Sequence, residues 1–151
     1  MAFAIGFEDA PLEHPYDDAS IPAARGRIVL GDWAEEFLAN LGEWTPEEYR
    51  NQWRRSIQSL LEGQRKAVLI TTFSSPKIAS HIEWWALYRV GEEVFAQNQL
   101  LFFEDIGGKF DTNRAVEYLR ERRTENNEGV SISEWNVSVS DLEAFASEGK
   151  H

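Results

Sequence analysis

The run HIEWWALYRV, residues 81–90, limits the possible folds more than any other part of the chain. Its β-branched, aromatic and aliphatic residues predict a strand over about Ile82–Val90. Successive side chains of a strand point to opposite faces, so adjacent Trp84 and Trp85 make both faces apolar. Such a strand lies centrally in a sheet, with helices covering one side and helix or loop covering the other.

Two more strands are predicted around it. Gly91-Glu92 forms a turn, and Val94–Phe103 is again apolar, so this segment forms a hairpin with the first strand. The polar run Gln97-Asn98-Gln99 interrupts the pattern and must contact water or find hydrogen-bond partners. RKAVLITTF, residues 65–73, is rich in β-branched residues and predicts a third strand.

The strongest helix-start signal lies in LGEWTPEEYRNQWRRSIQSLLEGQ, residues 41–64. Thr45 is expected at the N-cap, Pro46 at the first helical position, and Glu48 completes a capping box. Trp44 and Tyr49 occupy the two positions of a hydrophobic staple. The apolar stripe of the helix continues to Gly63 and consists of Tyr49, Trp53, Ile57, Leu60 and Leu61. The aromatic residues therefore favour a packing role, and a binding groove is the alternative.

The N-terminal third is expected to hold two short strands, a surface loop and a helix. Residues 3–8 and 27–30 have strand patterns, whereas residues 9–24 are rich in Pro, Asp and Ala without a period. Asp32 is predicted to cap a helix, because Glu35 stands at capping-box spacing and Gly42 follows the last apolar residue. The packing face of that helix would consist of Trp33, Phe37, Leu38 and Leu41.

The C-terminal third is expected to hold two helices and a strand. After a Gly107-Gly108 turn, a helix is predicted in residues 112–129, with Ala115, Val116 and Leu119 facing inward. Residues 129–135 predict a last strand. Ser140 and Glu143 form a third capping-box spacing, before a helix over 141–147.

Together these elements predict an α+β fold in one domain over residues 1–151. We expect a mainly antiparallel sheet of about five strands with about four helices packed on it, and a first segment, 1–25, that is partly loop. The chain has no cysteine, no signal-peptide pattern and no apolar run long enough to span a membrane. It is therefore expected to be a cytoplasmic protein.

Acidic residues are concentrated near the N-terminus. Residues 1–48 contain 11 Asp and Glu against two Arg, so most of the net charge of −11 lies there. Nucleic acids and anionic membranes are disfavoured as partners, since both are bound through Lys and Arg. A basic protein partner is favoured, because opposite charge raises encounter rates. Ordinary solubility is the alternative explanation.

Catalytic motifs are sparse. No second His and no Cys stand at metal-ligand spacing, and GxGxxG, GxxxxGK[ST] and GxSxG do not occur, so neither a metal nor another cofactor is predicted. The best enzymatic alternative is a small hydrolase or metal-dependent enzyme. It would use His81 and Glu83, which share a strand face, with Glu104 at the end of the next strand.

Several motifs resemble immunity proteins of contact-dependent growth inhibition systems. The matching segments are GRIVLGDWAEEF from Gly26, WTPEEYRNQW at 44–53, P-x4-HIEWWALYR at 76–89, QNQLLF at 97–102 and ISEW at 132–135. They cover most of residues 26–136, and residues 1–25 lie outside the resemblance. The shared pattern is a spacing of aromatics and glycines and contains no catalytic signature.

The resemblance implies a cytoplasmic inhibitor without enzymatic activity. Such a protein binds the C-terminal toxin domain of a delivered effector one to one and occludes its active site. The toxin domain is often a basic nuclease. Because toxin-facing surfaces vary within such families, no binding residue is carried over from the resemblance. The charge pattern instead predicts that the toxin contacts acids of the N-terminal loop and the helix after it. These are Glu8, Asp9, Glu13, Asp17, Asp18, Asp32, Glu35 and Glu36.

Overall fold

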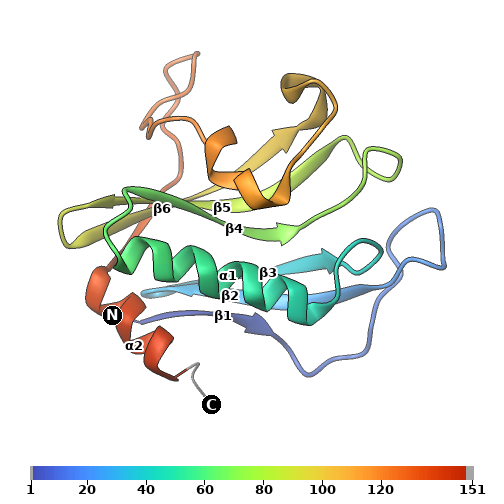
Figure 1. Cartoon of the computed structure of the whole chain (residues 1–151), viewed down its shortest axis with the longest axis horizontal. Helices are drawn as coiled ribbons and strands as arrows, with labels where there is room; N and C mark the ends of the chain where they lie inside the picture. Colours follow the sequence, from blue (N-terminus) through green and yellow to red (C-terminus); the bar gives the residue numbers. More distant parts are fainter. Residues whose placement is uncertain (1, 149–151) are drawn as a thin grey trace.

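Two antiparallel sheets form the framework of the computed structural model, which describes residues 2–148 (Figure 1). The first sheet has the order β1-β2-β3, formed by Phe3–Phe7, Ala23–Leu30 and Trp33–Asn40. The second has the order β4-β5-β6-β7, formed by Lys66–Thr72, His81–Val90, Glu93–Phe102 and Trp135–Ser138. The helical elements are α1 (Pro46–Leu61), α2 (Val139–Glu148) and the short 3-10 helices η1 (Phe103–Ile106) and η2 (Thr112–Tyr118).

The predicted α+β class is confirmed, but the expected arrangement is partly wrong. The described residues form seven strands in two sheets, where about five strands in one sheet were expected. Two α-helices and two short 3-10 helices replace the expected four helices packed on that sheet. None of the helices in residues 2–148 has the length and apolar character needed to cross a membrane.

Helix α1 begins where the sequence predicts. The Thr45 hydroxyl accepts a hydrogen bond from the Glu48 amide at 3.2 Å, and the Glu48 carboxylate accepts one from the Thr45 amide at 3.1 Å. The Trp44 and Tyr49 rings meet edge to face with centroids 5.1 Å apart, which is the predicted staple. The capping box and the staple are therefore both confirmed.

Helix α1 covers the edge of the second sheet. The side-chain amide of Gln52 donates to the Val68 carbonyl and accepts from the Ile70 amide, both at 2.9 Å. The Trp53 indole donates to the Ile70 carbonyl at 2.7 Å. These side chains supply hydrogen bonds that a neighbouring strand would otherwise give to β4.

The same helix packs on the inner face of the first sheet. The Trp53 ring lies 5.2 Å from the Phe7 ring and 5.9 Å from the Phe37 ring. Phe37 also lies against the backbone of Gly26, where an added Cβ would come within 2.3 Å of the ring. The aromatic residues near the start of α1 thus form part of the core, and the packing interpretation is confirmed over the binding groove.

The helix predicted after Asp32 is wrong, because this segment forms β3. Gly31 has a φ of 65° and, with Asp32, forms the two-residue turn of a hairpin in which Leu30 pairs with Trp33. β2 pairs on its other side with β1, so the segment belongs to a three-stranded sheet. Long-range pairing outweighs the local capping-box spacing.

Two C-terminal predictions are also wrong. Helical structure within residues 112–129 is limited to the kinked 3-10 helix η2, in which Ala115 is buried but Val116 is exposed. The last strand begins at Trp135, so most of residues 129–135 lie outside it. The helix predicted over 141–147 is present as α2, but it begins at Val139, because Ser138 and Asp141 form the reciprocal cap in place of Ser140 and Glu143.

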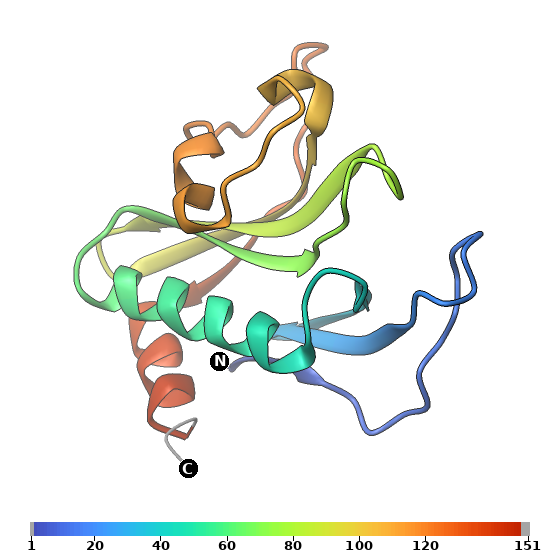
Figure 2. The ribbon, with the colours of Figure 1, turned by 45° about the vertical axis from the view of Figure 1, so that its right-hand side comes forward.

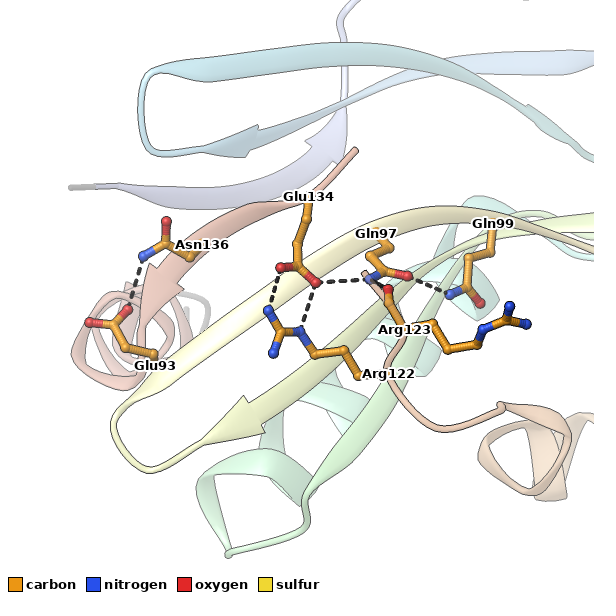
Figure 3. A network of polar contacts seen from close by, with 7 residues as sticks. All are labelled: Glu93, Gln97, Gln99, Arg122, Arg123, Glu134 and Asn136. Carbon is orange, nitrogen blue, oxygen red and sulfur yellow. Dashed lines mark hydrogen bonds and ion pairs between the residues drawn. The ribbon is translucent and has the colours of Figure 1, made fainter. Parts of the chain in front are cut away.

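Polar contacts hold the irregular segment 119–134 on the outer face of β6 (Figure 3). Arg122 donates two hydrogen bonds to the Glu134 carboxylate at 2.8 and 2.6 Å. The Gln97 amide donates to Glu134 and to the Arg123 carbonyl, both at 2.8 Å, and accepts from Gln99 at 3.0 Å. The polar interruption in β6 therefore has partners, as the sequence requires.

Candidate functional site

Three of the predicted acids gather on the outer face of the first sheet. Glu13 accepts a bidentate hydrogen bond from Arg25, at 2.8 and 3.0 Å. The Glu36 carboxylate lies 3.9 Å from the same guanidinium. Glu8 follows β1 and its amide donates to the Arg25 carbonyl at 2.9 Å. Acids from the β1–β2 connection and from β3 thus lie around one arginine of β2.

Like charges meet within this cluster. The neighbouring Glu36 carboxyl group, together with desolvation, raises the pKa of Glu8 above its usual value. Arg27 and Arg25 oppose that rise. The cluster is therefore a surface where carboxylates outnumber nearby cations, and it is suited to receive a positive group from a partner.

Three further predicted acids lie in the loop between β1 and β2, which extends away from the sheets (Figures 1 and 2). Asp9, Asp17 and Asp18 are all exposed. Asp18 accepts hydrogen bonds from the Ser20 amide and hydroxyl, at 2.9 and 2.6 Å, and these bonds lower the pKa of its carboxyl group. The loop and the outer-face cluster together form an acidic region.

The remaining two predicted acids lie elsewhere. Asp32 lies in the β2–β3 turn, four residues along β3 from Glu36, a span of roughly 13 Å. Glu35 pairs with the buried Ile28, so its side chain lies on the inner face. The expectation that Glu35 and Glu36 share the exposed side of a helix is wrong, because adjacent strand residues face opposite ways.

Glu35 has different neighbours, which the sequence pattern did not reveal. Burial raises the pKa of Glu35 and also that of the Tyr16 phenol, and the negative charge of Glu83 adds to both shifts. Glu83 belongs to β5, so its charge acts on a residue of the loop and on one of β3. Local sequence signals did not reveal that the two sheets pack face to face.

Arg25 was also missed as an organising residue. Its only sequence signal is the alternation of Arg25, Gly26 and Arg27, which places both arginines on the same side of β2. Once β2 and β3 are paired, Arg25 stands opposite Leu38 and next to the strand position of Glu36. A correct assignment of the β2–β3 hairpin would have identified it.

The residues of the enzymatic alternative do not form a joined site in the described part of the chain. His81 and Glu83 share a face of β5, but the His81 ring lies against Phe102 and its Nδ1 is 3.2 Å from the Ser80 hydroxyl. Glu104 is exposed in η1. Within residues 2–148, no three His, Asp or Glu side chains are placed to hold a metal ion together.

Comparison with known proteins agrees with the fold. The family model described as "CdiI N-terminal domain" matches residues 39–145. A curated relative, "Immunity protein CdiI" of Enterobacter cloacae, is 29% identical over 118 residues, which are 78% of this chain and 81% of the relative. A chain of the solved "CdiA-CT/CdiI toxin and immunity complex from Enterobacter cloacae" is 25% identical, with a TM-score of 0.84 and 97% of each chain covered.

The family match spans well over half of the residues, including α1, the second sheet and most of α2. The structural match extends over nearly the whole chain and includes the N-terminal sheet that the family model leaves out. The chain therefore belongs to the CdiI family, the immunity proteins of contact-dependent growth inhibition systems, whose role is inhibition and not catalysis.

Proposed function

We propose that this protein acts in the cytoplasm and neutralises the toxin domain of a contact-dependent growth inhibition effector by binding it one to one. The toxin is a basic nuclease, and the acidic region occludes its active site. Family membership supports the inhibitory role, and the related solved complex joins a toxin to an immunity protein. The acidic region formed by the loop and the outer-face cluster supports the choice of a basic partner.

The physical reason lies in the kind of surface that a nuclease must have. A nuclease grips an anionic backbone through Lys and Arg, so its substrate-binding surface is positively charged. The acidic region carries Glu8, Glu13 and Glu36 near Arg25 and three aspartates further along the loop. It can occupy such a surface without offering a bond that the enzyme cuts, and opposite charge speeds the encounter.

The direct test uses the purified protein and the toxin domain encoded next to it. We expect nucleic-acid cleavage to fall linearly as the protein is added and to stop at equal molar amounts. Light scattering should give the mass of one toxin domain plus one inhibitor. Cleavage that continues with inhibitor in excess would contradict the proposed function.

A charge-reversal pair tests the contribution of the acidic region. Glu8→Lys combined with Glu36→Lys should slow association with the toxin by at least about tenfold at low salt, and the difference should shrink at high salt. Glu125→Lys combined with Glu128→Lys is the matched control, since these exposed residues lie in the distant segment 119–134 and change the net charge equally. Equal association rates for both variants would exclude the acidic region as the binding surface.

A further inference from the structure

The first sheet leaves part of the inner face of the second sheet uncovered. β3 crosses from β7, where the Trp33 ring stacks on Trp135 at 5.0 Å, to β4, where the Leu38 carbonyl accepts from Thr72 at 2.6 Å. On the far side of this crossing, the end of β6 rises away from the first sheet (Figure 2). Its side chains Leu100 and Phe102 are 47% and 38% exposed.

These side chains belong to one continuous surface, here called the open face. With its side-chain amide oriented to satisfy both neighbours, Asn98 donates a hydrogen bond to the Glu83 carboxylate at 3.3 Å and accepts one from the Trp85 indole at 3.2 Å. Strand pairing places Glu83 opposite Leu100 and His81 opposite Phe102, all on the same side of the sheet. The open face consists of Trp33, Glu35, His81, Glu83, Asn98, Leu100 and Phe102.

The apolar part of the open face lies beside two carboxylates. Trp33 is 41% exposed although it stacks on Trp135, so three of the large exposed hydrophobic residues lie on this surface. Among residues 2–148, neither Glu35 nor Glu83 has a Lys or Arg within ion-pair distance. The negative charge of Glu83 also adds to the rise that burial causes in the pKa of Glu35. A cation placed between them would relieve this repulsion.

We infer that the open face is a second contact surface for the toxin domain, which places a basic side chain between Glu35 and Glu83 and apolar groups on Leu100 and Phe102. This inference rests on the proposed function. β3 links the two contact surfaces, because Glu36 points to the acidic region and Glu35 to the open face. A partner that covers β3 reaches both surfaces and approaches the roughly 800 Å² that each partner buries in a stable complex.

Other occupants fit this surface less well. Nucleic acid would bring phosphates close to Glu35 and Glu83, and a negative surface repels it. A second copy of this chain would bring its own carboxylates to the same place, so like charges would face each other. A basic protein satisfies both the charged and the apolar parts of the open face.

The test compares two double variants of the full-length protein. Leu100→Thr with Phe102→Thr removes apolar area from the open face and keeps residues that favour strands. Val90→Thr with Val130→Thr is the control, because both valines are 57% exposed and lie outside the open face. Circular dichroism confirms that each variant is folded, and calorimetric titration with the purified toxin domain measures the dissociation constant.

We expect the open-face variant to bind at least about 30-fold more weakly than wild type, as for the loss of interface hot spots, and the control to bind as wild type. Glu35→Gln with Glu83→Gln should weaken the salt dependence of binding. If the wild type binds the toxin and all variants bind equally well, the inference is wrong while the proposed function stands. If the wild type itself does not bind, the proposed function fails. A wild-type dimer that Leu100→Thr with Phe102→Thr dissociates would assign the open face to self-association and overturn the inference.

Discussion

Gln52 provides the sharpest test of how helix α1 is held against the second sheet. Its side chain is only 5% exposed and bonds both the Val68 carbonyl and the Ile70 amide of β4. Gln52→Met keeps the length and helix propensity of the side chain but removes both hydrogen-bond partners. The two backbone groups then remain buried without partners, because β4 is the edge strand of its sheet.

The expected loss of stability follows from these contacts. Each unpaired buried backbone group costs about 1–3 kcal/mol, so two cost about 2–6 kcal/mol. The more apolar Met side chain returns roughly 1 kcal/mol through burial. We therefore expect Gln52→Met to lower the free energy of unfolding by about 1–5 kcal/mol, a large fraction of the stability of a typical domain.

Urea denaturation followed by tryptophan fluorescence measures this difference. Gln58→Met is the matched control, since Gln58 lies on the exposed side of the same helix and should change stability by less than about 0.5 kcal/mol. Hydrogen exchange adds a local readout, because the Ile70 amide should lose protection in Gln52→Met. Equal unfolding midpoints for the two variants, with unchanged slopes, would refute the role assigned to Gln52.

Two further predictions concern the frame around the site. Gly26→Ala should lower the free energy of unfolding by about 1–3 kcal/mol, because the added Cβ would meet the Phe37 ring. Gly6→Ala is the control, since its Cβ would enter open space and should be less destabilising. Thermal melting of both variants measures the difference. Glu134→Gln should lower the free energy of unfolding by about 1–2 kcal/mol at pH 7, since hydrogen bonds from Arg122 hold the pKa of Glu134 below 4.5. A lowered folded-state pKa contributes stability above the unfolded value, which is lost as pH falls through the folded value. The deficit should therefore shrink below pH 4.5, and a deficit independent of pH would contradict this assignment.

Elements with strong local signals could be predicted from the sequence. The cap and staple define the start of α1, and runs of β-branched, aromatic and aliphatic residues define β4, β5 and β6. β3 could not be predicted in this way, because Asp32 and Glu35 fit a capping box while Gly31-Asp32 fits a hairpin turn. Pairing with β2 decides between them, and that contact is not local.

The candidate site also combines features that the sequence predicts with features that depend on long-range pairing. The charge count identifies the acidic N-terminal third, and the structure brings Glu8, Glu13 and Glu36 together there. The helix assignment, however, placed Glu35 beside Glu36 on one surface, whereas strand alternation separates them onto two. The segment 119–134 has no periodic pattern, and contacts distant in sequence determine its position.

The neighbouring carboxyl groups of Glu8 and Glu36 have a consequence for the energy of the unbound molecule. Glu36 belongs to β3 and Glu8 directly follows β1, so the pairing of both strands with β2 keeps the two groups near each other and the free protein carries like charges at its own surface. A cation arriving from a partner would relieve this repulsion. The isolated inhibitor would then be the less stable of its two states at this surface.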